Sequence, residues 1–246
     1  METSGISETI ANNMIDKKVR NNVDNALKYM KQNNINVISV FDDDYPQMLK
    51  KIYDPPICLY IKGNLQLLKM QNISLIGCRK CSQYGKKTAY YFSYNLSKAG
   101  FNIVSGLARG IDSYSHIGCL AAKGKTIAVM GSGLDNIYPK ENEQLVNEII
   151  KQNGAIITQY PLGTKPEKNN FPARNRIISG LSKAVLVIEA RAKSGTLITV
   201  DFALEQGKDV FAVPGNINSA NSVGTNELIK QGAIPVCNYK DVLDNI

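Results

Sequence analysis

The chain of 246 residues has no apolar run that approaches the roughly 18 consecutive residues needed to cross a bilayer. Its N-terminal stretch, METSGISETIANNMIDKKVR, also lacks the apolar core of a secretory signal peptide. We therefore expect a cytoplasmic protein without a membrane partner. With 43% hydrophobic and 20% charged residues, the chain contains enough apolar side chains for a full globular core.

Cysteine is scarce, and the five cysteines form an odd, scattered set that fits reduced thiols inside a cell. Cys78 and Cys81 make a C-x-x-C pair after a predicted strand, which is where a redox dithiol would lie. No second pair is present to complete a zinc site. We expect no metal and no other cofactor, and a redox role for the pair is the weaker interpretation.

Residues typical of catalysis are few. His116 is the only histidine, and on a predicted helix such a residue is more often packed or capping than a general base. Asp112, Asp135 and Glu189 follow predicted strands and could act as bases. Their favoured role is to pair with nearby arginines and hold them in place. These arginines are Arg79, Arg109, Arg174 and Arg176. We expect a protein that is not an enzyme.

The nucleotide-binding fingerprints are incomplete. Gly131 and Gly133 begin a G-x-G pattern, but Asn136 stands where the third glycine belongs and no acidic residue follows at the expected distance. A nicotinamide dehydrogenase is therefore disfavoured. The Gly-Lys-Ser/Thr of a P-loop is absent, since Gly124-Lys125-Thr126 lacks the preceding glycine spacing. Motor and kinase chemistry are not supported.

Positive charge is in excess, with 29 lysines and arginines against 21 acidic residues, a net charge of +8 and a pI of about 9.1. Such a balance favours a nucleic acid or another polyphosphate as the partner.

Strand-like and helical segments alternate from Ile73 onward, which predicts a parallel, doubly wound α/β sheet. The strand-like runs are ISLIG, FNIVSG, TIAVMGSG, AIITQYP, AVLVIEA, DVFAVPG and IPVCN. Three parts are expected: a short helical N-terminal segment over 1–43, a connector or edge segment with one strand over 44–72, and a doubly wound α/β domain over 73–246.

The stretch Phe171–Thr199 combines several features of an anion site. It opens on Phe171-Pro172, and the proline favours extended backbone before it rather than a helix start. Cationic Arg174 and Arg176 follow, then a buried strand, then Ser194-Gly195-Thr196 at a helix start, which favours phosphate. Each half alone has an ordinary structural explanation, as solvated arginines or an N-cap. Together they flank one strand at the sheet edge where α/β proteins bind ligands.

Glycine, cations and hydroxyls also follow the other predicted strands, so four loops are expected to converge on this edge. These loops are Gly77–Gly85, Ser105–Asp112, Gly131–Asn142 and Pro214–Gly215.

Taken in order, these motifs resemble the DprA/Smf family of DNA-processing proteins over roughly Asp44 to Ala233. The resemblance rests on G-x-R-x-x-S-x-Y-G from Gly77, SGLARGID from Ser105, D-x-x-YP-x-x-N from Asp135 and FP-x-RNRIISGLS from Phe171. It continues with Glu189-Ala190, SGTLIT from Ser194, Val213-Pro214-Gly215, and the segment from Ser222 to Ala233.

The resemblance implies that 73–246 is an extended Rossmann-like DNA-binding domain and that the protein is a homodimer. It further implies single-stranded DNA as ligand and RecA recombinase as the partner that receives the DNA during transformation or recombination. The expected DNA-binding residues are Arg79, Gly106, Arg109, Lys140, Phe171, Arg174, Asn175, Arg176, Ser194, Gly195 and Thr196. Phe171 would stack on a base, although a lone phenylalanine fits a core equally well. The binding would be sequence-nonspecific and non-catalytic.

The sequence departs from the family in three respects. Gln159 replaces a usual glutamate, the N-terminal helical domain is short, and the chain stops at Ile246 before the winged helix of many members. Two alternative functions stay open. Pro214-Gly215 and Gly224–Glu227 faintly resemble a phosphate loop of nucleotide phosphoribohydrolases, but eight residues separate the two halves here, so the loop is broken. The phosphate loops would also suit a signalling-nucleotide sensor.

Overall fold

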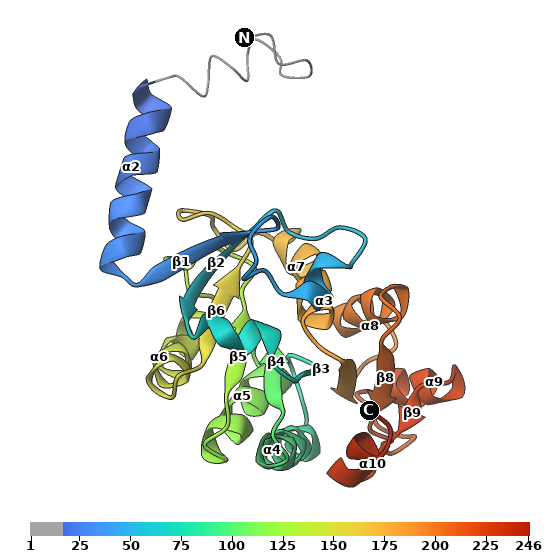
Figure 1. Cartoon of the computed structure of the whole chain (residues 1–246). Helices are drawn as coiled ribbons and strands as arrows, with labels where there is room; N and C mark the ends of the chain where they lie inside the picture. Colours follow the sequence, from blue (N-terminus) through green and yellow to red (C-terminus); the bar gives the residue numbers. More distant parts are fainter. Residues whose placement is uncertain (1–16) are drawn as a thin grey trace. The chain divides into compact units, whose positions relative to one another are not determined.

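The computed structural model describes residues 17–246, which contain a nine-stranded sheet in the order β1-β2-β6-β5-β4-β3-β7-β8-β9 (Figure 1). The strands are β1 (Ile35–Ser39), β2 (Cys58–Gly63), β3 (Asn72–Gly77), β4 (Asn102–Ser105), β5 (Thr126–Val129), β6 (Ala155–Thr158), β7 (Ala184–Glu189), β8 (Asp209–Ala212) and β9 (Ile234–Pro235). Neighbouring strands from β6 through β3 to β9 run parallel, whereas β2 pairs with β6 antiparallel, with Tyr60 opposite Thr158. The predicted α/β class with a mostly parallel sheet is confirmed.

Two hydrophobic clusters cover the two faces of this sheet. One contains side chains of α4 (Gln83–Lys98), α5 (Ile111–Ala121) and α10 (Tyr239–Leu243), including Phe92. The other contains side chains of α3 (Gln47–Lys50), α7 (Asn170–Gly180), α8 (Gly195–Glu205) and α9 (Val223–Lys230), including Ile177. Helices on both faces explain why the central strands are buried apolar runs rather than alternating ones.

The remaining elements are α2 (Lys17–Gln32), α6 (Glu143–Lys151) and the short 3-10 helices η1 (Leu65–Lys69) and η2 (Lys140–Asn142). The described residues divide into two compact units between Asn36 and Val37, and β2 and η1, from the expected connector 44–72, belong to the larger one. The helical pattern expected at Ile10 and Met14 lies outside the described residues. No helix in the described part of the chain combines the length and apolarity that a bilayer crossing requires.

Two local expectations were wrong. Strand β1 was not predicted, because INVIS lies in a polar segment whose helical pattern dominates. Helix α7 begins at Asn170 and includes Phe171-Pro172 in its first turn. A proline is tolerated there, because the first N–H groups of a helix have no partner within the helix.

His116 lies on α5 with no exposed surface. The Thr126 hydroxyl donates to the Ile103 carbonyl at 2.6 Å, so it accepts from Nδ1–H of His116 at 2.7 Å. The Nε2 atom has no partner. Burial, aided by the charge of Arg174, lowers the pKa of His116 from 6.5 to about 3. The ring is therefore a neutral packing residue, as expected, and lines no cavity that we describe below.

Acid should destabilise the fold through His116. Its pKa is lower in the folded than in the unfolded chain, so its contribution is full above about pH 6.5 and is lost as the pH falls toward about 3. The free energy of unfolding should fall by about 1.4 kcal/mol per pH unit within this window through this residue alone. Urea titrations of the wild type and His116→Leu at several pH values measure the free energy of unfolding of each protein. The slope of this free energy against pH should be larger for the wild type, and the difference between the two slopes separates the effect of His116 from that of the carboxylates. Equal slopes would contradict the neutral, buried state of His116.

Candidate nucleic-acid interface

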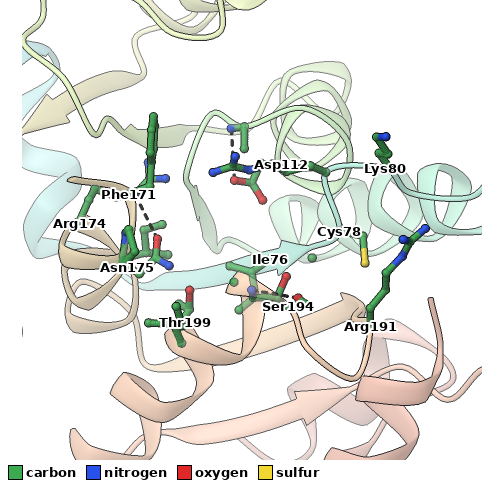
Figure 2. A pocket seen from close by; sticks show the side chains of 18 of the residues that line it. Ile76, Cys78, Lys80, Asp112, Phe171, Arg174, Asn175, Arg191, Ser194 and Thr199 are labelled. Carbon is green, nitrogen blue, oxygen red and sulfur yellow. Dashed lines mark hydrogen bonds between the residues drawn. The ribbon is translucent and has the colours of Figure 1, made fainter. Parts of the chain in front are cut away.

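A cavity of about 660 Å³ lies where the winding of the sheet reverses, between the carboxyl ends of β3 and β7. The chain leaves β3 for α4 on one face and leaves β7 for α8 on the other, which opens a crevice between the two loops. Figure 2 shows Phe171 and Asn175 of α7 with Thr199 of α8 on one side of the cavity, and Lys80 and Arg191 on the other.

The cavity is strongly positive. Its lining contains five cationic side chains and, among the described residues, one carboxylate, Asp112. The cations are Arg79, Lys80, Lys168, Arg174 and Arg191. All except Arg174 are exposed, whereas Asp112 is buried. An anion is the ligand that such a lining favours.

The N-terminus of α8 supplies uncharged donors at the same cavity. Ser194 caps the helix by accepting from the Thr196 amide at 3.1 Å. Gly195 faces open space, since an added Cβ would meet no atom within 4 Å. Thr196 and Thr199 also line the cavity. The amides of Thr196 and Leu197 already bond to Ser194, so it is the positive end of the helix dipole, beside the open Gly195, that favours a phosphate here.

Arg174 forms the floor of the site rather than a free contact. Its side chain is 3% exposed, and Nη1 donates to the carbonyl of Gly106 at 2.7 Å and to that of Val129. The arginine thus ties α7 to the ends of β4 and β5. Burial lowers the pKa of Arg174 to about 10, a shift that the charge of Asp112 opposes, so the guanidinium stays protonated at neutral pH.

Asp112 completes this floor. Its Oδ2 accepts from the amides of Gly106 at 3.1 Å and Ala108 at 3.3 Å. Burial raises the pKa of Asp112, whereas the charge of Arg174 and these amides act in the opposite direction. Glycine is required at position 106, because a Cβ there would lie 2.7 Å from Asp112 Oδ2 and 2.9 Å from Arg174 Nη2. The expected pairing of Asp112 with an arginine is present as an attraction between its charge and that of Arg174.

Phe171 stands at the wall of the cavity between two aromatic or cationic neighbours. The guanidinium of Arg79 lies 5.2 Å from its ring centroid, and the Tyr138 ring lies 5.5 Å away. Gly131 leaves room for the ring, since a Cβ there would approach it to 2.9 Å. Phe171 is half-buried. Phe171 therefore lies at the edge of the site, where one part of its ring packs against the protein and another part stays accessible. Its position is compatible with both the core role and the stacking role that the sequence left open.

The structure brings most of the predicted site residues together. The cavity lining includes seven of them: Arg79, Phe171, Arg174, Asn175, Ser194, Gly195 and Thr196. Gly106 and Arg109 line a small adjoining hollow that shares Arg79, Phe171 and Arg174 with the cavity. Arg109 pairs with Glu141 there, with Nη2 donating to Oε2 at 2.7 Å. Their DNA contacts stay predictions.

Two predicted residues lie elsewhere. Lys140, at the start of η2, lines neither hollow. Arg176 points to the segment before β2, where Nε donates to the carbonyl of Asp54 at 2.8 Å and lies 3.1 Å from its carboxylate. We therefore do not place Arg176 in the cavity. The loop Pro214-Gly215, expected to converge there, does not line it either.

Among the cationic and aromatic residues of the lining, the predicted site omitted four: Lys80, Tyr138, Lys168 and Arg191. Lys80 lies three residues after the end of β3 and Arg191 two residues after the end of β7, so their position at the sheet edge was a usable signal. Lys168 belongs to the loop between β6 and α7, which has no periodic pattern to place it.

The other carboxylates expected to hold arginines do not. Glu189, 2% exposed, accepts from the amide of Ser82 at 2.9 Å and from its hydroxyl, and so fixes the start of α4. Asp135 accepts from the amide of Gly163 at 2.8 Å. Glu227, part of the hydrolase-like pattern, is exposed on α9 and lies 3.5 Å from Lys230. None of the three lines the cavity.

Comparison with known families identifies the chain. The family model of DNA recombination-mediator protein A matches residues 36–246. The chain belongs to this family.

Members of the DprA/Smf family are similar to most of this chain. DNA processing protein DprA of Bacillus subtilis is 42% identical over 90% of this chain and 74% of its own length. DprA of Streptococcus pneumoniae is 46% identical over 83% of the chain and 72% of its length. Protein Smf of Escherichia coli is 41% identical over 92% and 61%, respectively.

Solved structures of two DprA proteins share the fold. That of S. pneumoniae superposes with a TM-score of 0.83 at 43% identity, over 89% of this chain and 77% of that one. DNA processing protein A of Helicobacter pylori, described for its single-stranded DNA binding mode, gives a TM-score of 0.77 at 32% identity, over 85% and 94%. The predicted resemblance to the DprA/Smf family and its Rossmann-like fold is confirmed.

Proposed function

We propose that the chain binds single-stranded DNA in the cavity at the carboxyl ends of β3 and β7 without reading its sequence, and hands the strand to RecA recombinase. The observation that carries the proposal is the cavity lining, with five cations and one buried carboxylate. The exposed cations would contact phosphates, and Phe171 beside Arg79 offers a face on which a base can stack. The single-stranded DNA binding of the H. pylori relative supports this choice of ligand.

The size of the cavity favours a single strand. A volume of about 660 Å³ is that of a small-molecule pocket and suits a short stretch of nucleotides. B-form DNA, whose major groove alone is about 12 Å wide, is read by an inserted helix or ribbon rather than received in a pocket. Backbone amides, hydroxyls and cations recognise phosphates and carry no base specificity.

We further propose that the protein acts without catalysis. The ionisable groups that could serve as bases are committed to structure: Asp112 holds the amides of the β4–α5 loop, Glu189 holds the start of α4, and His116 is buried beside Thr126. Delivery to RecA and assembly as a homodimer rest on the family membership. The protein should therefore accelerate RecA polymerisation on an oligonucleotide that it already covers, and an unchanged rate would remove this part of the proposal.

Salt should weaken the binding steeply. Fluorescence anisotropy of labelled oligo-dT over a series of salt concentrations measures the slope of log affinity against log salt. Each phosphate contact contributes about −0.7 for a single strand, so four exposed cations predict a slope approaching about −2.8. A duplex of equal length should compete poorly. A flat slope, or a duplex that competes as well as a single strand, would overturn the proposal.

A further inference from the structure

Helix α4 carries a row of basic and aromatic side chains on one partly exposed face, outside the cavity. Lys86, Tyr90, Tyr94 and Lys98 recur every four residues, so they lie one above another along the helix. We call this row the α4 ridge. It is not part of the core, because α4 buries a different set of side chains: Gly85, Ala89, Phe92, Ser93 and Leu96.

The side chains of the ridge contact one another as a ladder. The rings of Tyr90 and Tyr94 are stacked, with centroids 6.1 Å apart and an interplanar angle of 16°. The ammonium group of Lys98 lies 5.8 Å from the Tyr94 ring. At the other end, the ammonium of Lys86 lies 5.4 Å from the ring of Tyr114 on α5. Tyr90 is 39% exposed, so an aromatic face is held in place at the surface.

The charge around the ridge is of one sign. Helices α4 and α5, which pack side by side (Figure 1), contain one carboxylate between them, the buried Asp112. Lysines stand at positions 86, 87 and 98 of α4, and no ion pair in the described part of the chain involves them. Helix α6 differs, because it mixes Glu143 and Glu148 with Lys151, which lies 3.7 Å from Glu148.

The ridge also begins close to the cavity. The loop between β3 and α4 lines the cavity from Gly77 to Lys80, and Lys86 follows six residues later. From Lys86 to Lys98 the helix rises by about 18 Å, at about 1.5 Å per residue. A strand that leaves the cavity past Lys80 could therefore continue along α4 onto the ridge.

We propose that the α4 ridge is a second contact surface for single-stranded DNA, which receives the part of the strand that extends beyond the cavity. The inference rests on the proposed function, since it assumes that the cavity holds one part of the same strand. Bases would stack on Tyr90 and Tyr94, and Lys86 and Lys98 would neutralise phosphates on either side. An acidic protein segment would need the lysines but not the aromatic faces, and the test separates these two ligands.

The test compares a short oligo-dT of about 6 nucleotides, which fills the cavity, with one of about 30 nucleotides, which reaches the ridge. Anisotropy gives both affinities for the wild type and for Tyr90→Leu/Tyr94→Leu. The variant should bind the long oligomer at least about 5-fold more weakly and the short one within about 2-fold of the wild type. Tyr90→Phe, which keeps the ring, should bind both like the wild type. Tyr53→Leu removes a fully exposed tyrosine elsewhere and serves as the matched control.

A second variant does not depend on the tyrosines or on their packing. For the long oligomer, Lys86→Gln/Lys98→Gln should make the slope of log affinity against log salt less negative by about 1.4. The slope for the short oligomer should stay unchanged. Lys151→Gln on α6 is its control. If both ridge variants bind the long oligomer like the wild type, the inference is wrong and the cavity proposal stands. If only the lysine variant weakens binding, the stacking surface is refuted. If the wild type binds neither oligomer, the proposed function fails first.

Discussion

Arg174→Leu should destabilise the protein by about 3–5 kcal/mol, the range for leaving a buried charge without the opposite charge that offsets it. The variant removes the charge that faces Asp112, whose pKa burial already raises. It also leaves the carbonyls of Gly106 and Val129 without the donor that joins them. Urea unfolding measures the loss, and a change below about 1 kcal/mol would contradict a structural role for this arginine.

The matched control is Arg176→Gln on the same helix. The Arg176 side chain is 12% exposed and donates to the carbonyls of Asp54 and Ala173, but its Asp54 carboxylate partner is 71% exposed and stays hydrated, so the substitution should cost about 1–3 kcal/mol, less than the loss of Arg174. Adding Asp112→Asn to Arg174→Leu should recover part of the lost stability, because the uncompensated charge is then gone. Weak DNA binding by an Arg174 variant would therefore reflect the loss of the structure beneath the cavity rather than the loss of a phosphate contact.

Arg79→Ala/Lys80→Ala/Arg191→Ala should bind short oligo-dT at least about 100-fold more weakly, since each charged hydrogen bond contributes about 1.5–3 kcal/mol. All three side chains are exposed, so the fold should survive their loss. Within the protein, the substitutions remove the stack of Arg79 on Phe171 and the hydrogen bond from Arg191 Nε to Asn221 at 2.9 Å.

Anisotropy measures the affinity of this triple variant, and unfolding in urea confirms that it is folded. Arg176→Gln, which lies outside the cavity, should bind within about 3-fold of the wild type. An equal loss of affinity in both variants would mean that the strand passes over the outer face of α7 instead.

The pair Arg174 and Arg176 shows what the sequence could and could not predict. Two residues apart on a helix, they are separated by about 200° and so face opposite ways. The expectation of extended backbone at Phe171-Pro172 hid this, because the proline in fact occupies the first turn of α7. Even with the helix known, only packing decides which arginine faces Asp112 and which faces Asp54.

The strands from β3 to β9 were predictable, because each is a short apolar run bounded by glycine or polar residues and alternates with a helix. Convergence of their loops on one edge follows from parallel topology, which placed Arg79 and Ser194 correctly at one cavity. Lys168 could not be placed in this way, since a loop without pattern is positioned only by the folded chain. The partners of Glu189 were equally invisible, because Ser82 is 107 residues away.

Photocrosslinking tests the central claim, that a single strand lies in the cavity beside Phe171, most directly. A short oligo-dT of about 6 nucleotides with 5-iodouracil bases is irradiated with the protein, and the joined peptides are identified by mass spectrometry. We predict adducts in the peptide of Phe171, with Tyr138 as the second site, and their loss in the triple cation variant. Adducts that spare both residues and appear on exposed tyrosines such as Tyr53 would contradict the account.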